Sequence, residues 1–107
     1  MANYPKLVRD LIPEEISRRG AVPEVRVARP DEMLSWLLRK MREEVDEFQS
    51  APSSEELADM LEVLRALAKS TGVSFEEVMR RCDAKRTVKG AFDQGYIIHR
   101  VTEPPAT

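Results

Sequence analysis

Two acidic clusters are the residues of this sequence best suited to chemistry: EEVDE at 43–47 and ELAD at 56–59. Each lies in a stretch whose apolar residues recur at helical spacing, and a short break at 51–52 separates the two stretches. Helices joined by so short a link run antiparallel. Folding the chain about the break brings two carboxylates of the first cluster level with two of the second: Glu44 with Asp59, and Glu47 with Glu56.

Four carboxylates gathered in one small volume cannot all stay ionised without a cation among them. All-oxygen ligation favours a hard divalent ion, so the spacing predicts a Mg²⁺ or Mn²⁺ site. The alternative is an ordinary solvated acidic helix face, because Glu56 on its own is explained by a capping box with Ser53. The match in level and in rotation about both helices favours the metal site over this alternative.

The elements that position these residues are predicted to be mainly helical. A short helix at 13–19 precedes three longer ones, at about 31–49, from the Ser53 cap to about residue 70, and at about 74–90. Segments 25–27 and 96–101 alternate like strands that could pair, and the tail at 102–107 is expected to fray. The expected architecture is a single domain, 1–107, forming an antiparallel helical bundle with a short peripheral β pairing.

Apolar stripes on the two helices of the hairpin are predicted to form the core. Their members are Leu34, Leu37, Leu38, Met41, Val45 and Phe48, then Leu57, Met60, Leu61, Leu64, Leu67 and Ala68. Trp36, Val63 and Ala66 fall off these stripes, and apolar residues on two sides of such helices indicate a homodimer or homotetramer. Trp36 could instead stack on a nucleobase, although packing is the favoured interpretation.

The last helix carries a stripe that changes from apolar to basic. Phe75, Val78, Met79 and Cys82 are followed on one face by Lys85, Arg86 and Lys89. This pattern is typical of a cation-lined pocket for an oxyanion, or of last-turn cations that interact with the helix C-terminus. Cys82 is expected to be a small core residue and His99 a strand residue.

Composition limits the partners of the chain. It has 107 residues, 34% of them charged, and a net charge of −2, which gives no long-range attraction for nucleic acid or an anionic membrane. One cysteine excludes an internal disulfide framework, and no apolar run approaches the roughly 18 residues of a membrane span. A cytoplasmic location is therefore expected.

Three segments together resemble a known family. The acidic clusters are similar to the EExxE…ExxD signature of MazG-type all-α nucleoside triphosphate pyrophosphohydrolases. KLVRDLIP at 6–13 resembles the KLVRDKIP opening of small phosphoribosyl-ATP pyrophosphohydrolase-like members, and Lys85 with KGAF at 89–92 resembles their K…RGGF segment. The resemblance spans about 6–98. It departs from the family in a short gap of eight residues between the acidic halves, at Leu11, and in the KGA of 89–91.

The resemblance implies Mg²⁺-dependent hydrolysis of a nucleotide between its α and β phosphorus atoms, giving a monophosphate and pyrophosphate. The implied metal ligands are Glu44, Glu47, Glu56 and Asp59, while Glu43 matches the leading acid of the motif. Glu47 or Glu44 would accept the proton of the attacking water. The implied phosphate-binding residues are Lys85, Lys89, Lys6 and Arg9, although a salt bridge with Asp10 would explain the last two equally well.

Two alternatives remain open from the sequence. The substrate could be phosphoribosyl-ATP of histidine biosynthesis, which resembles a nucleoside triphosphate in its reactive part. The chain could also be a non-catalytic helical oligomerisation module that keeps its acidic face for solubility or regulatory metal binding.

Overall fold

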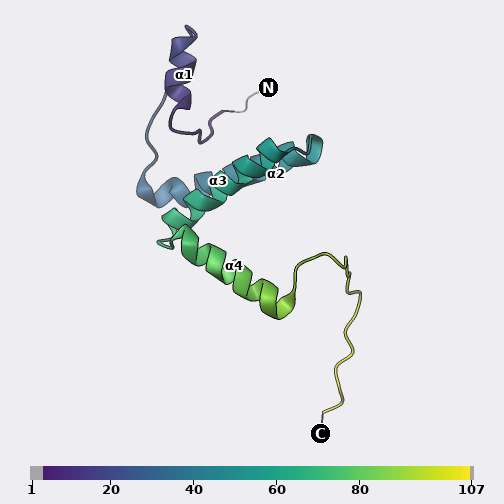
Figure 1. Ribbon diagram of the computed structural model, residues 1–107. Helices are drawn as coiled ribbons and strands as arrows, with labels where there is room; N and C mark the ends of the chain where they lie inside the picture. Colours follow the sequence, from purple (N-terminus) through teal and green to yellow (C-terminus); the bar gives the residue numbers. More distant parts are fainter. Residues whose placement is uncertain (1–3, 107) are drawn as a thin grey trace. The chain divides into compact units, whose positions relative to one another are not determined.

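The structure, a computed structural model, describes residues 4–106 and is mainly helical (Figure 1). Its elements in chain order are α1 (Ile12–Arg18), the 3₁₀ turn η1 (Pro30–Glu32), α2 (Met33–Ser50), α3 (Ser54–Ser70) and α4 (Phe75–Lys89). The chain divides into two compact units, of which the first ends at Phe75 and the second begins at Glu76.

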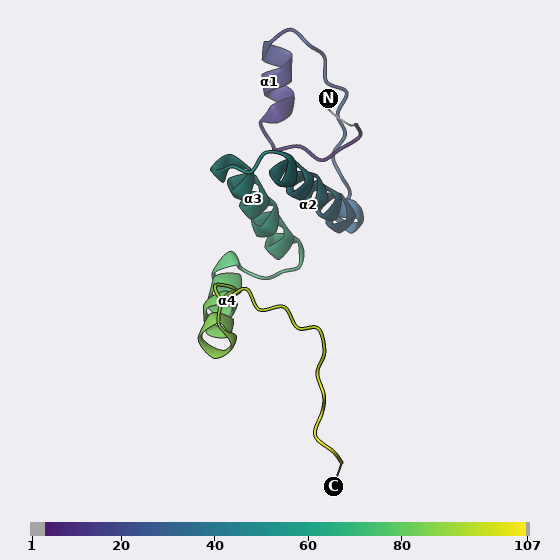
Figure 2. The ribbon, with the colours of Figure 1, turned by 90° about the vertical axis from the view of Figure 1, so that its right-hand side faces the viewer.

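The centre of the first unit is a hairpin of α2 and α3, which lie side by side and antiparallel (Figure 2). Pro52 disfavours helical backbone at the residue before it, and Ala51 is accordingly not helical, with φ −147° and ψ 81°. Ser53 then caps α3, because its Oγ accepts a hydrogen bond from the Glu56 amide at 3.1 Å. Such a cap contributes about 1 kcal/mol. The predicted helix–break–helix arrangement is confirmed.

The residues buried between α2 and α3 include two that lie outside the predicted apolar stripes, Val63 and Glu44. Leu37 and Val63 are only 3% and 7% exposed, and the carboxylate Glu44 is equally buried at 5%. We call the contact between the two helices the seam. Val63 was expected on a second side of its helix, so this expectation was wrong: Val63 belongs to the seam.

Much of the predicted stripe instead forms a second, uncovered face of the hairpin. Successive residues of a helix are rotated by about 100° about its axis. Because α2 and α3 are antiparallel, a residue that follows a seam residue by one position lies on the same side of the hairpin in both helices. Leu38, Val45 and Leu64 each follow a seam residue by one position, so they share that side. The uncovered apolar face consists of Leu34, Leu38, Val45, Leu57, Leu61 and Leu64, all between 39% and 51% exposed.

On α2, the start of the helix is tied to the preceding loop by Glu32. Its carboxylate accepts two hydrogen bonds from Arg26, at 2.8 and 2.9 Å, one from the Arg29 amide at 2.8 Å and one from the Trp36 indole at 2.9 Å. The hydrogen bonds from Arg26, followed by those from Trp36 and Arg29, hold the pKa of Glu32 well below its usual range. The loop and the Trp36 ring are thereby fixed against α2.

The predicted β pairing between 25–27 and 96–101 is not found. Residues 4–106 contain no strand, and both segments are irregular and exposed. Alternation of apolar residues does not form a strand without a hydrogen-bonding neighbour, and these two segments belong to different compact units.

The second unit, from Glu76 onward, contains nearly all of α4 and the irregular tail. Cys82 is exposed, so the prediction that it is a core residue was wrong, and Met79 is 48% exposed. Gly90, with φ +85°, follows the end of α4, and its amide donates to the Arg86 carbonyl at 2.8 Å. Across residues 4–106, no helix combines the length and apolar character needed to cross a membrane.

Candidate metal centre at the helix seam

Glu44 is the buried charged residue of the hairpin. It lies on the seam side of α2, where Leu37 precedes it by two turns. One of its carboxylate oxygens, Oε1, lies 3.4 Å from the Lys40 ammonium. The other, Oε2, is inaccessible to solvent and has no hydrogen-bond partner among the described residues. A buried oxygen without a partner costs free energy, so its position calls for a ligand or a proton.

Two carboxylates of α3 face Glu44 across the seam. One oxygen from each of Glu44, Glu56 and Asp59 lies within 4.8 Å of the others. Glu56 is in the first turn of α3, held there by the Ser53 cap, and Asp59 follows three residues later on the same face. Glu56 Oε2 is also inaccessible and without a hydrogen-bond partner among residues 4–106. The predicted approach of Glu44 to the α3 carboxylates is therefore present.

The pKa values of Glu44 and Glu56 are raised above the ordinary value. Burial raises the pKa of Glu44 to about 7, and the negative charge of Glu47 adds to this effect. Burial also raises the pKa of Glu56, with further contributions from the charges of Glu47 and Asp59. Oxygen atoms of Glu44, Glu56 and Asp59 that lie this close together form a donor set that could hold Mg²⁺ or Mn²⁺.

Glu47 and Glu43, two further acids of the first cluster, lie outside this group. Glu47 is exposed, yet it is near enough for its charge to raise the pKa of both Glu44 and Glu56. Its role as a fourth ligand or as a base stays a prediction. Glu43 pairs with Lys6 and Lys40 instead. Partial burial raises the pKa of Glu43, but the hydrogen bond from Lys6 and the charges of Lys6 and Lys40 have the larger combined effect. The net result is a lowered pKa.

The N-terminal segment brings two of the predicted cations to the acidic residues. Lys6 pairs with Glu43 of α2, with 3.2 Å between Nζ and Oε1. Arg9 pairs with Asp59 of α3 at 2.7 Å. Asp10, which the sequence offered as an alternative partner for both, takes part in neither contact. The segment therefore crosses the hairpin and supplies Asp59 with an internal counter-ion.

Lys40 is a functional candidate that the sequence reasoning missed. Its ammonium lies 3.4 Å from Glu43 and 3.4 Å from Glu44, and its side chain is only 17% exposed. The spacing of three and four residues on one helix was the available signal, because such pairs meet on the helix surface.

The remaining predicted cations, Lys85 and Lys89, lie on α4, and both are exposed residues of the second unit. Their predicted contact with phosphates stays a prediction.

Searches among known protein families, curated proteins and solved structures find no match for this chain. The resemblance to MazG-type enzymes therefore depends on the motif residues themselves.

The raised pKa of Glu44 predicts a pH dependence of stability in the metal-free protein. Between the ordinary value of 4.5 and about 7, folded Glu44 binds a proton that the unfolded chain does not. The free energy of unfolding should therefore rise as the pH falls from about 7 to 4.5, by at most about 1.4 kcal/mol per pH unit. Above pH 7, Glu44 should add no pH dependence to the free energy of unfolding.

Urea unfolding with a chelator present, repeated across this window, measures the effect. The Glu44→Gln variant should lose this part of the slope, whereas Asp46→Asn, at an exposed position of the same helix, should keep it. An unchanged slope in Glu44→Gln would contradict the assignment.

Proposed function

We propose that this chain is a Mg²⁺-dependent nucleotide pyrophosphohydrolase of the MazG-like type, with Mn²⁺ as an alternative ion. It cleaves the α–β phosphate bond of a nucleoside triphosphate or related nucleotide, releasing a monophosphate and pyrophosphate. The observation that carries the proposal is the buried Glu44 carboxylate, whose unpartnered oxygen lies beside Glu56 and Asp59. A solvated acidic face would leave these oxygens in water, and the matching sequence motifs give independent support.

In this proposal the residues divide the work according to their position. Glu44, Glu56 and Asp59 hold the ion, with Glu47 at the exposed edge of the group. When bound, the ion neutralises charge on the phosphates and at the attacked phosphorus. Glu47 is exposed to water and accepts the proton of the attacking water, with Glu44 as the other candidate. The cations proposed to bind phosphate are Lys6, Arg9, Lys85 and Lys89.

Binding of an ion at Asp59 must compete with Arg9, because the same carboxylate already holds the guanidinium at 2.7 Å. An exposed ion pair of this kind contributes up to about 1 kcal/mol, so Arg9→Ala should tighten Mn²⁺ binding by up to about fivefold. Calorimetric titration without nucleotide measures this. Arg18→Ala, which breaks an exposed ion pair with Glu14, should leave the affinity unchanged. Weaker Mn²⁺ binding in Arg9→Ala would argue against the competition.

The activity is tested with a panel of normal and damaged nucleoside triphosphates and phosphoribosyl-ATP, each with Mg²⁺ and with Mn²⁺, scored for pyrophosphate release. Asp59→Asn and Glu47→Gln should lower turnover by at least about 100-fold, because one removes an ion ligand and the other the base. The matched control, Asp46→Asn, should keep its activity. Full activity in both test variants would refute the site.

The same panel separates the alternatives. Preference for phosphoribosyl-ATP would assign the chain to that reaction. No turnover of any nucleotide, with no rise in melting temperature on adding Mg²⁺ beyond a general salt effect, would favour a non-catalytic oligomerisation module.

The proposed assembly is a homodimer or homotetramer in which a second copy covers the uncovered apolar face. Among the described residues only Leu37, Val63 and Ala68 are buried apolar residues, which is a small core for a chain of this length. The face is identical on every copy, so two hairpins can pair symmetrically as a helical bundle. Charge does not oppose the contact, since all six residues of the face are aliphatic.

A charge placed on this face should prevent assembly. Leu61→Glu should convert the wild-type oligomer to a monomer at about micromolar concentration, since pairing would bury the new carboxylate. Light scattering after gel filtration measures the mass. Val22→Glu, at an apolar residue that is 92% exposed in the loop before η1, should assemble normally. A monomeric wild-type protein would overturn the proposed assembly.

A further inference from the structure

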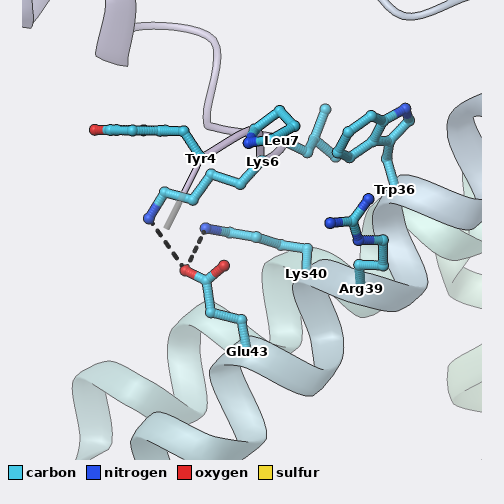
Figure 3. A pocket seen from close by; sticks show the side chains of 8 residues that line it. Tyr4, Lys6, Leu7, Trp36, Arg39, Lys40 and Glu43 are labelled. Atoms are coloured by element: carbon cyan, nitrogen blue, oxygen red, sulfur yellow. Dashed lines mark hydrogen bonds and ion pairs between the residues drawn. The ribbon is translucent and has the colours of Figure 1, made fainter. Parts of the chain in front are cut away.

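A pocket of about 170 Å³ lies between the N-terminal segment and α2 (Figure 3). The residues that matter for its chemistry are Tyr4 and Lys6 from the segment, and Trp36, Arg39, Lys40 and Glu43 from α2. Its volume is comparable to one heterocyclic ring, so any larger ligand must extend out of it.

The charges around the pocket favour an anion. Lys6, Arg39 and Lys40 line it, whereas Glu43 is its one acidic lining residue. Glu43 is shared between two of these cations, with Lys6 at 3.2 Å and Lys40 at 3.4 Å (Figure 3). The pocket keeps an excess of positive charge on a chain whose net charge is −2.

The aromatic residues favour a planar ring. The Arg39 guanidinium lies 4.7 Å from the centre of the Trp36 ring, and Lys6 lies 5.8 Å from the centre of the Tyr4 ring. The Trp36 indole is held in place because its N–H donates to Glu32 at 2.9 Å. A planar guanidinium backed by a fixed indole is a surface on which a nucleobase can stack.

Lys40 links the pocket to the candidate metal centre. Its ammonium lies 3.4 Å from Glu43 in the pocket and 3.4 Å from Glu44 at the seam. We propose that the pocket binds the nucleoside monophosphate half of the substrate, with the base against Arg39 and Trp36 and the phosphate next to Lys6 and Lys40. This inference rests on the proposed function, because the remaining phosphates would bind the divalent ion that the three seam carboxylates are proposed to hold.

The test uses the fluorescence of Trp36, which is the one tryptophan of the chain. The full-length protein, with a chelator to remove divalent ions, is titrated with the 5′-monophosphates of the five common bases, with ribose 5-phosphate and with inorganic phosphate. At least one nucleoside monophosphate should quench the fluorescence saturably, and both compounds that lack a base should leave it unchanged. Absence of saturable quenching by every monophosphate overturns the proposal.

Two variants locate the binding. Lys40→Met and Arg39→Ala should each raise the Kd at least about tenfold, through loss of a phosphate contact and of the stacking surface. Lys69→Met, at an exposed residue near the end of α3, should bind as the wild type does. Circular dichroism confirms that each variant is helical. Equal binding by Lys69→Met and both pocket variants overturns the proposal.

The outcomes also separate this inference from the proposed function. Pyrophosphate release whose KM is the same in wild type and Arg39→Ala would keep the hydrolase and refute the pocket. Saturable, Lys40-dependent binding of a monophosphate without turnover of any triphosphate would keep the pocket and refute the hydrolase.

Discussion

The burial of Glu44 between two helices is the constraint on which the rest of the site depends. A carboxylate that is 5% exposed needs a proton, a cation or several hydrogen bonds. Lys40 is the nearby cation, and it is shared with Glu43. The positive charge supplied by this lysine is therefore too small for the carboxylates that meet at the seam. Burial is the main cause of the raised pKa of Glu44, and the charge of Glu47 adds to it. The same oxygens could hold a divalent ion.

Placing acids at the seam has a consequence for packing. Each seam position occupied by a carboxylate is lost to the apolar core, and Leu37 and Val63 are the apolar residues buried beside Glu44. Leucines one position further along, such as Leu38 and Leu57, lie on the uncovered apolar face. The hairpin thus has a seam that combines acidic and apolar residues, with the uncovered apolar face beside it. Both features have the same origin in the helical repeat.

The sequence predicted the local features of this arrangement well. The Ser53 cap, the break at Pro52 and the level of Glu44 with Asp59 all follow from short-range rules, and the structure bears them out. It could not decide which side of a two-sided helix faces its neighbour, so Val63 was misplaced. It also could not identify the partner of Arg9, because Asp59 is 50 residues away and Asp10 is adjacent. The β pairing failed for the same reason, since alternation does not specify a partner.

The ion pairs of the N-terminal segment connect the pocket to the metal centre energetically. Lys6 ties the segment to α2 through Glu43, and Arg9 ties it to α3 through Asp59. If the proposed ion binds Asp59, it would release Arg9, and a phosphate beside Lys6 would weaken the hold of Lys6 on Glu43. Because both ion pairs order one short segment, loss of either would remove part of what holds the other in place. In the proposed enzyme, the guanidinium freed from Asp59 would then be available to a phosphate of the substrate.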